Sequence, residues 1–437
     1  MKGSLLEGNI RRQLITLAAP LMIGNILQQL YNTVDSLIIG RFLGTEAFSA
    51  VGIAGTIMNL FIFVLTGFCT GISVILAQLY GSGDRSAFRK EVFVAISLGT
   101  GITLALSGLF LALMRPVLVL INSPAELIGY IESYLLVIIG GMLATYFYNL
   151  FSGILRAIGD TRAATLFLFI AVTVNAMLDL LFVGKLGTGI AGAAWATVIA
   201  QLLSAICCLL YLLRRDRDLL CTRYEFQFEK SLVRQTMKFG FSSALHQSTL
   251  YIGKIFVQGA VNTLGTAGIA GYTATMRVEG FANSIGNSVG HGLSVFASQN
   301  KGAGQDERAR EGVKQGMILS IIMGLCMSAA MYVTAEAGMR IFLDASETEA
   351  IAQGAGYMRL IALFYLLCFT GNSFAGFFRG VGQIRVMLMS TLMHILCRVI
   401  FSHLLVGSMG LPAVALATGI GWTLMTVFQI YNYRRVR

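Results

Sequence analysis

Two carboxylates stand inside apolar runs of this sequence, and each has a polar side chain one helical turn before it. Asp35, in the stretch LYNTVDSLIIG, follows Tyr31 by four residues, and Asp179 follows Asn175 by four. Residues four apart share one face of a helix. An ionised carboxylate is costly to hold away from water, and two such groups that lie close together can share one proton near neutral pH. Thr197, in GIAGAAWAT, offers a hydroxyl that can hydrogen-bond either form of a carboxyl.

Two other interpretations of these residues stay open. The oxygen atoms of Asp35, Asn175, Asp179 and Thr197 are ligands of the kind that hard cations prefer, so Na⁺ is a possible occupant. Asp35 can also act as a structural tie between helices through Asn175, because hydrogen-bond networks inside proteins often have no catalytic or transport role.

A second group of ionisable residues interrupts the apolar runs of the C-terminal half. Glu279 is expected to pair with Lys254 or Arg398, because a lone buried charge is expensive. If the basic side chains instead face a cavity, they favour anionic or zwitterionic cargo. Ionisable residues in apolar segments are functional candidates by default. The substrate-cavity candidates are Asn149, Asn372, Lys254, Arg277, Glu279 and Arg398.

The composition predicts that helices in a membrane position these residues. The chain is 56% hydrophobic and 12% charged, where a soluble protein carries about 25% charged residues. Long apolar runs without period-two alternation favour helices over a membrane barrel. We expect twelve spanning segments, at about 13–40, 47–81, 88–114, 126–155, 162–184, 188–213, 232–262, 266–300, 312–335, 350–378, 384–406 and 410–433.

The basic residues gather on one side of this predicted topology. With both termini inside, 24 Lys and Arg residues lie in the inner segments, and four (Arg41, Arg115, Lys185 and Arg340) lie in the outer loops. This asymmetry follows the positive-inside rule. The net charge of +11 is therefore explained by topology, and we expect no nucleic-acid partner.

The two halves of the chain match each other. LGT at 43–45 returns at 264–266, and SGILRAIGDTR at 152–162 returns as AGFFRGVGQIR at 375–385. Tyr134 and Tyr357, and Asn149 and Asn372, fall on the same register. Each half holds six segments, so both halves begin inside and the repeat is parallel. We expect two six-helix lobes, 1–220 and 221–437, an organisation that suits alternating access.

The stretches PLMIGNILQQLYNTVDSLIIGRFLG, AQLYGSGD, LRAIGDTR and NAMLDLLFVGKLGTGIAGAAWAT resemble, in order and spacing, those of the multidrug and toxic compound extrusion (MATE) transporters. The resemblance implies a V-shaped pair of lobes and export of cationic, amphipathic compounds in exchange for H⁺ or Na⁺. It also implies that Tyr31, Asp35, Asn175, Asp179 and Thr197 form an ion-coupling cluster. Segments 232–262 and 350–378 lack the acids of Na⁺-coupled members, which favours H⁺.

The sequence therefore predicts an all-α membrane protein that works as a proton-coupled antiporter for organic compounds. Na⁺-coupled drug export and flipping of a lipid-linked precursor are the alternatives. GNSVG at 286–290 lies within a helical run and is interpreted as a helix-packing motif, so an intramembrane enzyme is the least favoured class. We expect no cofactor and no resident metal, contact with membrane lipid, a monomer, and a place in a prokaryotic inner membrane with both termini cytoplasmic.

Overall fold

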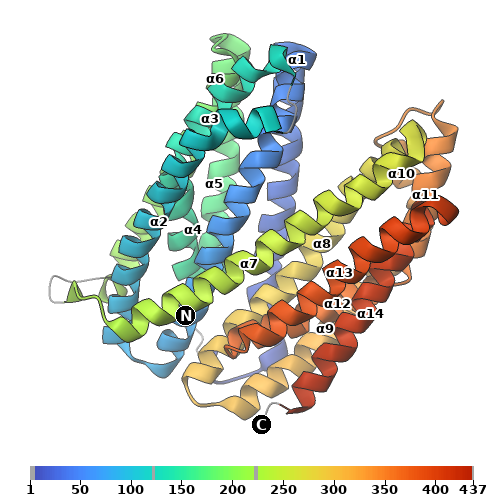
Figure 1. Ribbon diagram of the computed structural model, residues 1–437. Coiled ribbons are helices and arrows are strands. Elements are labelled where there is room, and N and C mark those ends of the chain that lie inside the picture. The colour runs from blue at the N-terminus through green and yellow to red at the C-terminus, as the bar shows by residue number, and fades with distance from the viewer. Residues whose placement is uncertain (1–4, 121–123, 221–224, 436–437) are drawn as a thin grey trace. The chain divides into compact units, whose positions relative to one another are not determined.

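The computed structural model describes residues 5–120, 124–220 and 225–435, and within these ranges every regular element is a helix. The all-α prediction is confirmed (Figure 1). The first half of the chain holds α1 (Ile10–Ser82), α2 (Arg85–Leu120), α3 (Ala125–Gly140), α4 (Met142–Ala157), α5 (Thr161–Asp179), the π-helical turn η1 (Leu180–Lys185), α6 (Gly189–Arg215) and η2 (Arg217–Leu219). The second half holds α7 (Lys230–Val261), η4 (Asn262–Leu264), α8 (Gly265–Gly302), α9 (Asp306–Val333), α10 (Ala335–Arg340), α11 (Thr348–Ala362), α12 (Tyr365–Gly380), α13 (Ile384–Met409) and α14 (Leu411–Arg435).

The helices form two compact units that differ from the predicted halves at two places. One unit, here the N-unit, is Ile26–Ala244, and the other, the C-unit, combines Met1–Asn25 with Leu245–Arg437. The start of α1 packs in the C-unit, where Asn25 Nδ2 donates to Ser288 Oγ at 3.0 Å. The start of α7 packs in the N-unit, where Thr236 Oγ1 donates to Glu91 at 2.8 Å. Each unit thus contains the opening turns of the other repeat.

Ten of the twelve predicted segments coincide with helices that are apolar enough to cross a membrane. Eight single helices qualify within the described residues, and two bent pairs raise the number to ten. The bent pairs are α3 with α4, at 45°, and α11 with α12, at 54°. The remaining two segments are α7 and α8, which are 32 and 38 residues long but more polar. At 1.5 Å per residue both are long enough to span.

Glycines end two helices at matching places in the repeat. Gly44 has φ 85° and divides α1 into Ile10–Gly44 and Glu46–Ser82. Gly265 has φ 73° and separates α7 and η4 from the rest of α8. A left-handed backbone is open to glycine without steric cost and is strained for other residues. The repeated LGT motif therefore marks the same turn in both halves.

The chain between the two repeats folds back onto α2 in the N-unit. Arg89 pairs with Glu225 and also donates from Nη1 to the carbonyl of Asp218 at 2.9 Å. Lys90 pairs with Glu229 at 3.3 Å. Hydrogen bonds from Ser231 and Lys90 hold the pKa of the Glu229 carboxyl below its usual value. This polar connection is therefore fixed at the predicted inner end of α2.

The GNSVG stretch packs helix against helix. A Cβ atom built on Gly290 would lie 2.5 Å from the carbonyl oxygen of Asn372 in α12, and one on Gly286 would lie 3.3 Å from the ring of Phe369. Backbones can approach this closely only where no side chain intervenes. The packing interpretation of this motif is confirmed.

Asp160 caps the N-terminal end of α5, and a first prediction concerns this cap. Its side chain accepts from the backbone N–H of Ala163 at 3.1 Å and from the hydroxyl of Tyr211 at 2.8 Å. Because Asp160→Ala removes this helix cap, we expect a loss of about 1–2 kcal/mol in stability. Thermal unfolding of the detergent-purified protein measures it, with Asp160→Asn as the control that keeps an acceptor. Equal melting of Asp160→Ala and wild type would contradict the assignment.

Candidate functional site

A polar cluster lies in the N-unit where α1, α3, α5 and α6 meet. Tyr31 and Asp35 come from α1, Asn175 and Asp179 from α5, and Thr197 from α6. Asp179 is fully buried and is the last residue of α5, just before the π-helical turn η1. Such turns occur frequently at functional sites. The structure brings together all five residues that the sequence predicted as the ion-coupling cluster.

Hydrogen bonds connect α1, α5 and α6 through Thr197. In the amide orientation that satisfies both of its polar atoms, Asn175 donates to Asp179 Oδ2 at 2.9 Å and accepts from the backbone N–H of Thr197 at 3.0 Å. The hydroxyls of Tyr31 and Thr197 lie 3.3 Å apart. Thr197 Oγ1 also donates to the carbonyl of Ala193 at 3.2 Å. The hydrogen bonds around the carboxylates therefore link residues of three helices, α1, α5 and α6.

The two carboxyl groups of the cluster face each other. Asp35 and Asp179 lie within hydrogen-bonding range, so one can donate to the other when it carries a proton. Each has one buried Oδ1 atom that lacks a partner among the described residues, and no ion pair in the described part of the chain includes either carboxylate. Two adjacent anions without a countercharge repel strongly in a poorly solvated site. The pair can therefore take up a shared proton or a monovalent cation.

Tyr134 of α3 also belongs to this cluster, and the sequence did not place it there. Its side chain is buried, and it lies within electrostatic reach of both Asp35 and Asp179. The signal was its register with Tyr357 in the repeat, which showed a matched tyrosine but not its neighbours.

A second polar cluster lies in the C-unit. Glu279 of α8 and Arg398 of α13 are both buried, and Tyr272 and Tyr357 lie beside them with ring centroids 5.7 Å apart. Lys254 of α7 is an exposed electrostatic neighbour. The predicted ion pair does not form: no bridge within 4.0 Å joins Glu279 to Arg398 or Lys254 in the described part of the chain. The reason is that Arg398 donates to the hydroxyl of Tyr272 instead, at 3.3 Å.

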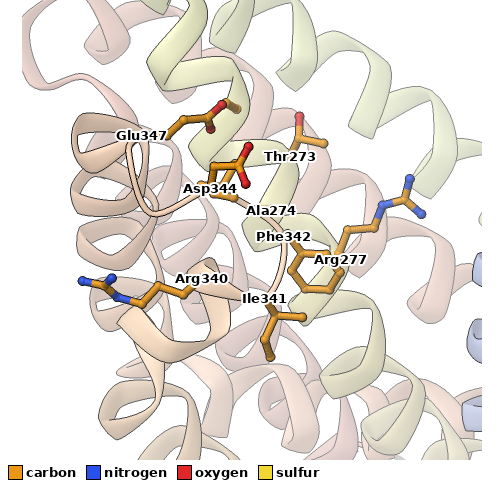
Figure 2. Close-up of a pocket in the computed structure, with 10 residues that line it drawn as sticks. Thr273, Ala274, Arg277, Arg340, Ile341, Phe342, Asp344 and Glu347 are labelled. Carbon is orange, nitrogen blue, oxygen red and sulfur yellow. The ribbon is translucent and has the colours of Figure 1, made fainter. Parts of the chain in front are cut away.

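Arg277 lies apart from that cluster. It lines a hollow of about 560 Å³ between α8 and the connection from α10 to α11, together with Arg340, Asp344 and Glu347. Figure 2 shows Arg277 and Phe342 on one side of this hollow and Arg340 directed away from it. Arg340 pairs with Glu336 at 2.8 Å, so its charge is already matched. The hollow is open to the surface, and its lining brings no second predicted site residue to Arg277.

The two asparagines of the repeat also lie outside both clusters. Asn149 Nδ2 donates to the carbonyl of Thr145 in its own helix at 2.8 Å. Asn372 lies against the glycines of α8, with Nδ2 3.7 Å from the sulfur of Cys368. Their contacts are those of helix packing, and their predicted place in a substrate cavity stays a prediction.

The MatE family model matches the chain twice, over residues 20–181 and 243–404, which together make up 324 of its 437 residues. The two matches begin and end 223 residues apart, which confirms the internal repeat. They include the residues of both polar clusters except Thr197.

Known proteins resemble the chain over most of its length. YpnP of Bacillus subtilis (strain 168), named a probable multidrug resistance protein, is 28% identical over 434 residues, or 98% of this chain and 96% of its own. The FAD transporter of Shewanella oneidensis is 23% identical over 336 residues, 76% and 73% of the two chains. A MOP superfamily transporter from Pyrococcus furiosus, described as having a binding pocket of reverse polarity, superimposes with a TM-score of 0.90 at 23% identity, covering 99% and 97%. That structural likeness establishes the fold.

Proposed function

The chain belongs to the MATE family of membrane transporters, and we propose that it exports small organic compounds in exchange for protons. It is an integral membrane protein and a transporter rather than an enzyme. The observation that carries the proposal is the facing pair of carboxylates, Asp35 and Asp179, which has no cation partner among the described residues. Such a pair can bind and release one proton, because the protonated carboxyl can hydrogen-bond to the carboxylate beside it and relieve the repulsion between the two charges.

The proposed mechanism uses the hydrogen bonds around the pair. With both carboxylates ionised, the cluster attracts the cationic group of an amphipathic compound. A proton that arrives from outside removes one negative charge, and the hydrogen bonds from Asn175 and Thr197 rearrange around the new donor. Because Tyr31 and Asp35 sit on α1, this change acts on that helix and lowers the affinity for the compound. Proton entry and compound release are thereby linked.

Na⁺ coupling is the second candidate. Its supporting observation is that oxygen atoms of Asp35, Asp179 and Thr197 lie around the pair, although Asn175 turns its amide N–H and not its carbonyl oxygen toward Asp179. Hard cations bind sites of this kind. Against it stands the absence of any acid in 232–262 and 350–378, the segments that carry acids in the Na⁺-coupled members that the sequence resembles.

Efflux from proteoliposomes distinguishes the two ions. We expect a fluorescent organic cation to leave the vesicles when an opposing proton gradient is imposed at equal Na⁺. A Na⁺ gradient at equal pH is expected to move none. Efflux under the Na⁺ gradient alone would transfer the assignment to Na⁺, and efflux under neither would reject export of organic cations.

The cargo need not be cationic. One relative is named an FAD transporter, and FAD carries negative phosphates. YpnP is named a probable multidrug resistance protein, which favours several cargoes. We propose drug-like organic compounds as the main class, with a lipid-linked precursor as the alternative. We also propose that the protein works as a monomer in a prokaryotic inner membrane, without a cofactor or nucleic acid, and with both termini cytoplasmic.

A further inference from the structure

Part of the C-unit cluster occupies repeat positions of the N-unit cluster, with the opposite charge. At the spacing of 223 residues that relates SGILRAIGDTR to AGFFRGVGQIR, Tyr357 and Arg398 stand where the first repeat has Tyr134 and Asn175, and Ser402 stands in the place of Asp179. The LGT motifs are 221 residues apart, and at that spacing Lys254 corresponds to Thr33 and Phe256 to Asp35. Both repeats therefore place a polar cluster on corresponding helices, with two acids in the first and two bases in the second.

The guanidinium of Arg398 is buried and incompletely bonded. Its side chain is 7% exposed, and in the described part of the chain it makes one hydrogen bond, from Nη2 to Tyr272. Its Nε is buried without a partner among those residues. Guanidinium has five donors and matches the geometry of carboxylate and phosphate. A buried arginine with most of its donors unused is ready to receive an oxyanion.

The charges near Arg398 do not balance. Glu279 is the acid of this cluster, and Arg398 and Lys254 are its two bases. One Oε1 atom of Glu279 is buried without a partner, and no ion pair within 4.0 Å joins it to either base in the ranges that the structure describes. With all three groups ionised, one positive charge is left over. An added anion would neutralise it at a position where charge is expensive.

Aromatic side chains complete the surroundings of Arg398. The hydroxyls of Tyr357 and Tyr365 are fully buried: that of Tyr357 lies near the Glu279 carboxyl, and that of Tyr365 has no hydrogen-bond partner among the described residues. Buried polar atoms of this kind usually bind something. The ring of Trp422 lies 5.5 Å from that of Tyr365 and 5.8 Å from that of His394, centroid to centroid. The cluster thus combines hydroxyl donors with flat apolar faces.

We propose that the C-unit cluster binds the carboxylate or phosphate of an organic anion, with Arg398 as the principal ligand and Tyr357 and Tyr365 as hydrogen-bond donors. Lys254 adds positive charge, and Glu279 balances part of the charge of the empty site. That the anion is cargo rests on the proposed transport function. Its binding does not, and can be tested without any gradient.

Trp422 supplies a reporter next to the site. The chain has two tryptophans, so Trp195→Phe leaves Trp422 as the single one. Purified protein with this background is placed in phosphatidylcholine nanodiscs, and tryptophan fluorescence is followed during titration with riboflavin 5′-phosphate or with neutral riboflavin. The two probes share the flavin ring, which accepts energy from tryptophan, and differ in the phosphate. We expect saturable quenching by the phosphate form and a Kd at least about tenfold weaker for riboflavin.

Arg398→Gln tests the principal ligand. We expect this substitution to raise the Kd for riboflavin 5′-phosphate about 10- to 100-fold, because the charge-assisted hydrogen bonds are lost. The Kd for riboflavin should not change. Arg398→Lys keeps the positive charge but loses the paired N–H donors of the guanidinium. Its Kd for riboflavin 5′-phosphate should lie between those of the background protein and Arg398→Gln. Arg385→Gln, at an exposed arginine near the start of the same helix α13, is the matched control and should bind as the background does. If Arg398→Gln does not elute as a folded protein, Arg398→Lys and the exposed Lys254→Gln are used, each with an expected loss of at least about threefold.

Three outcomes decide the proposal. Equal binding of the two flavins, or undiminished binding in the folded Arg398 variants, would overturn it while leaving proton-driven efflux untouched. Preference for the phosphate form that Arg398 variants lose would support it. The lipid source is separated by a repeat in nanodiscs that contain phosphatidylglycerol: loss of flavin phosphate binding there would assign the same site to an anionic lipid headgroup, and unchanged binding would assign it to a soluble anion.

Discussion

Asp35→Asn is expected to reduce proton-driven efflux to the level of vesicles without protein. Asparagine has nearly the same shape but cannot take up a proton, so the pair with Asp179 loses its shared proton site. The experiment is efflux of a fluorescent organic cation from proteoliposomes under an imposed proton gradient. Glu46→Gln is the matched control, because Glu46 is an exposed acid at the start of the next helical segment. It should transport as wild type does.

The thermal stability of Asp35→Asn separates coupling from a structural tie. Removing one of two facing carboxylates without a cation partner relieves repulsion, so the melting temperature is expected to stay equal or to rise. A structural tie through Asn175 would instead make the variant melt lower. Wild-type efflux by Asp35→Asn would refute the coupling role, and a lower melting temperature with intact efflux would favour the tie.

Gly376→Ala is expected to destabilise the C-unit by about 3 kcal/mol or more, because it forces two helices apart. A Cβ atom at Gly376 in α12 would lie 2.1 Å from the carbonyl oxygen of Gly290 in α8. The obstructing atom is backbone, so no side chain can rotate away. Thermal unfolding of the purified protein in detergent measures the effect.

The repeat supplies the control for this substitution. Gly153 matches Gly376 in sequence, but a Cβ atom there would meet Ser73 Cβ at 3.7 Å, an ordinary contact. Alanine favours a helix over glycine by up to about 1 kcal/mol, so Gly153→Ala should melt equal to or above wild type. A similar loss of stability in both variants would show that the close approach of α8 and α12 does not cause the effect of Gly376→Ala.

Helical spacing predicts which residues of the N-unit polar cluster share a face: Tyr31 with Asp35, and Asn175 with Asp179, are four apart. That these pairs meet around Thr197, as they do in the structure, was implied by the resemblance to the family and not by the spacing. Spacing says nothing about which face meets which neighbour across space. Tyr134 was therefore missed, although it is buried beside both carboxylates.

In the C-unit, too, spacing along the sequence did not predict which residues lie together in space. Arg277 and Glu279 are two residues apart and were considered together, yet one lies exposed at the hollow and the other is buried beside Arg398. Residues two apart on a helix point to different sides. The bends within α3–α4 and α11–α12 were also missed, because each pair reads as one unbroken apolar run. Bends in such runs depend on packing that the hydropathy pattern does not contain.

The helices shared between the repeats impose an order on biogenesis. Residues up to Asn25 leave the ribosome well before their packing partners, which are in Leu245–Arg437. At about 5–20 residues per second, the interval between them is on the order of 10–40 s. During that time Asn25 and the small residues near Ala18 lack the α8 surface that they later contact. The segment up to Asn25 thus reaches its final neighbours only after the second repeat has been synthesised, and membrane insertion must keep it available until then.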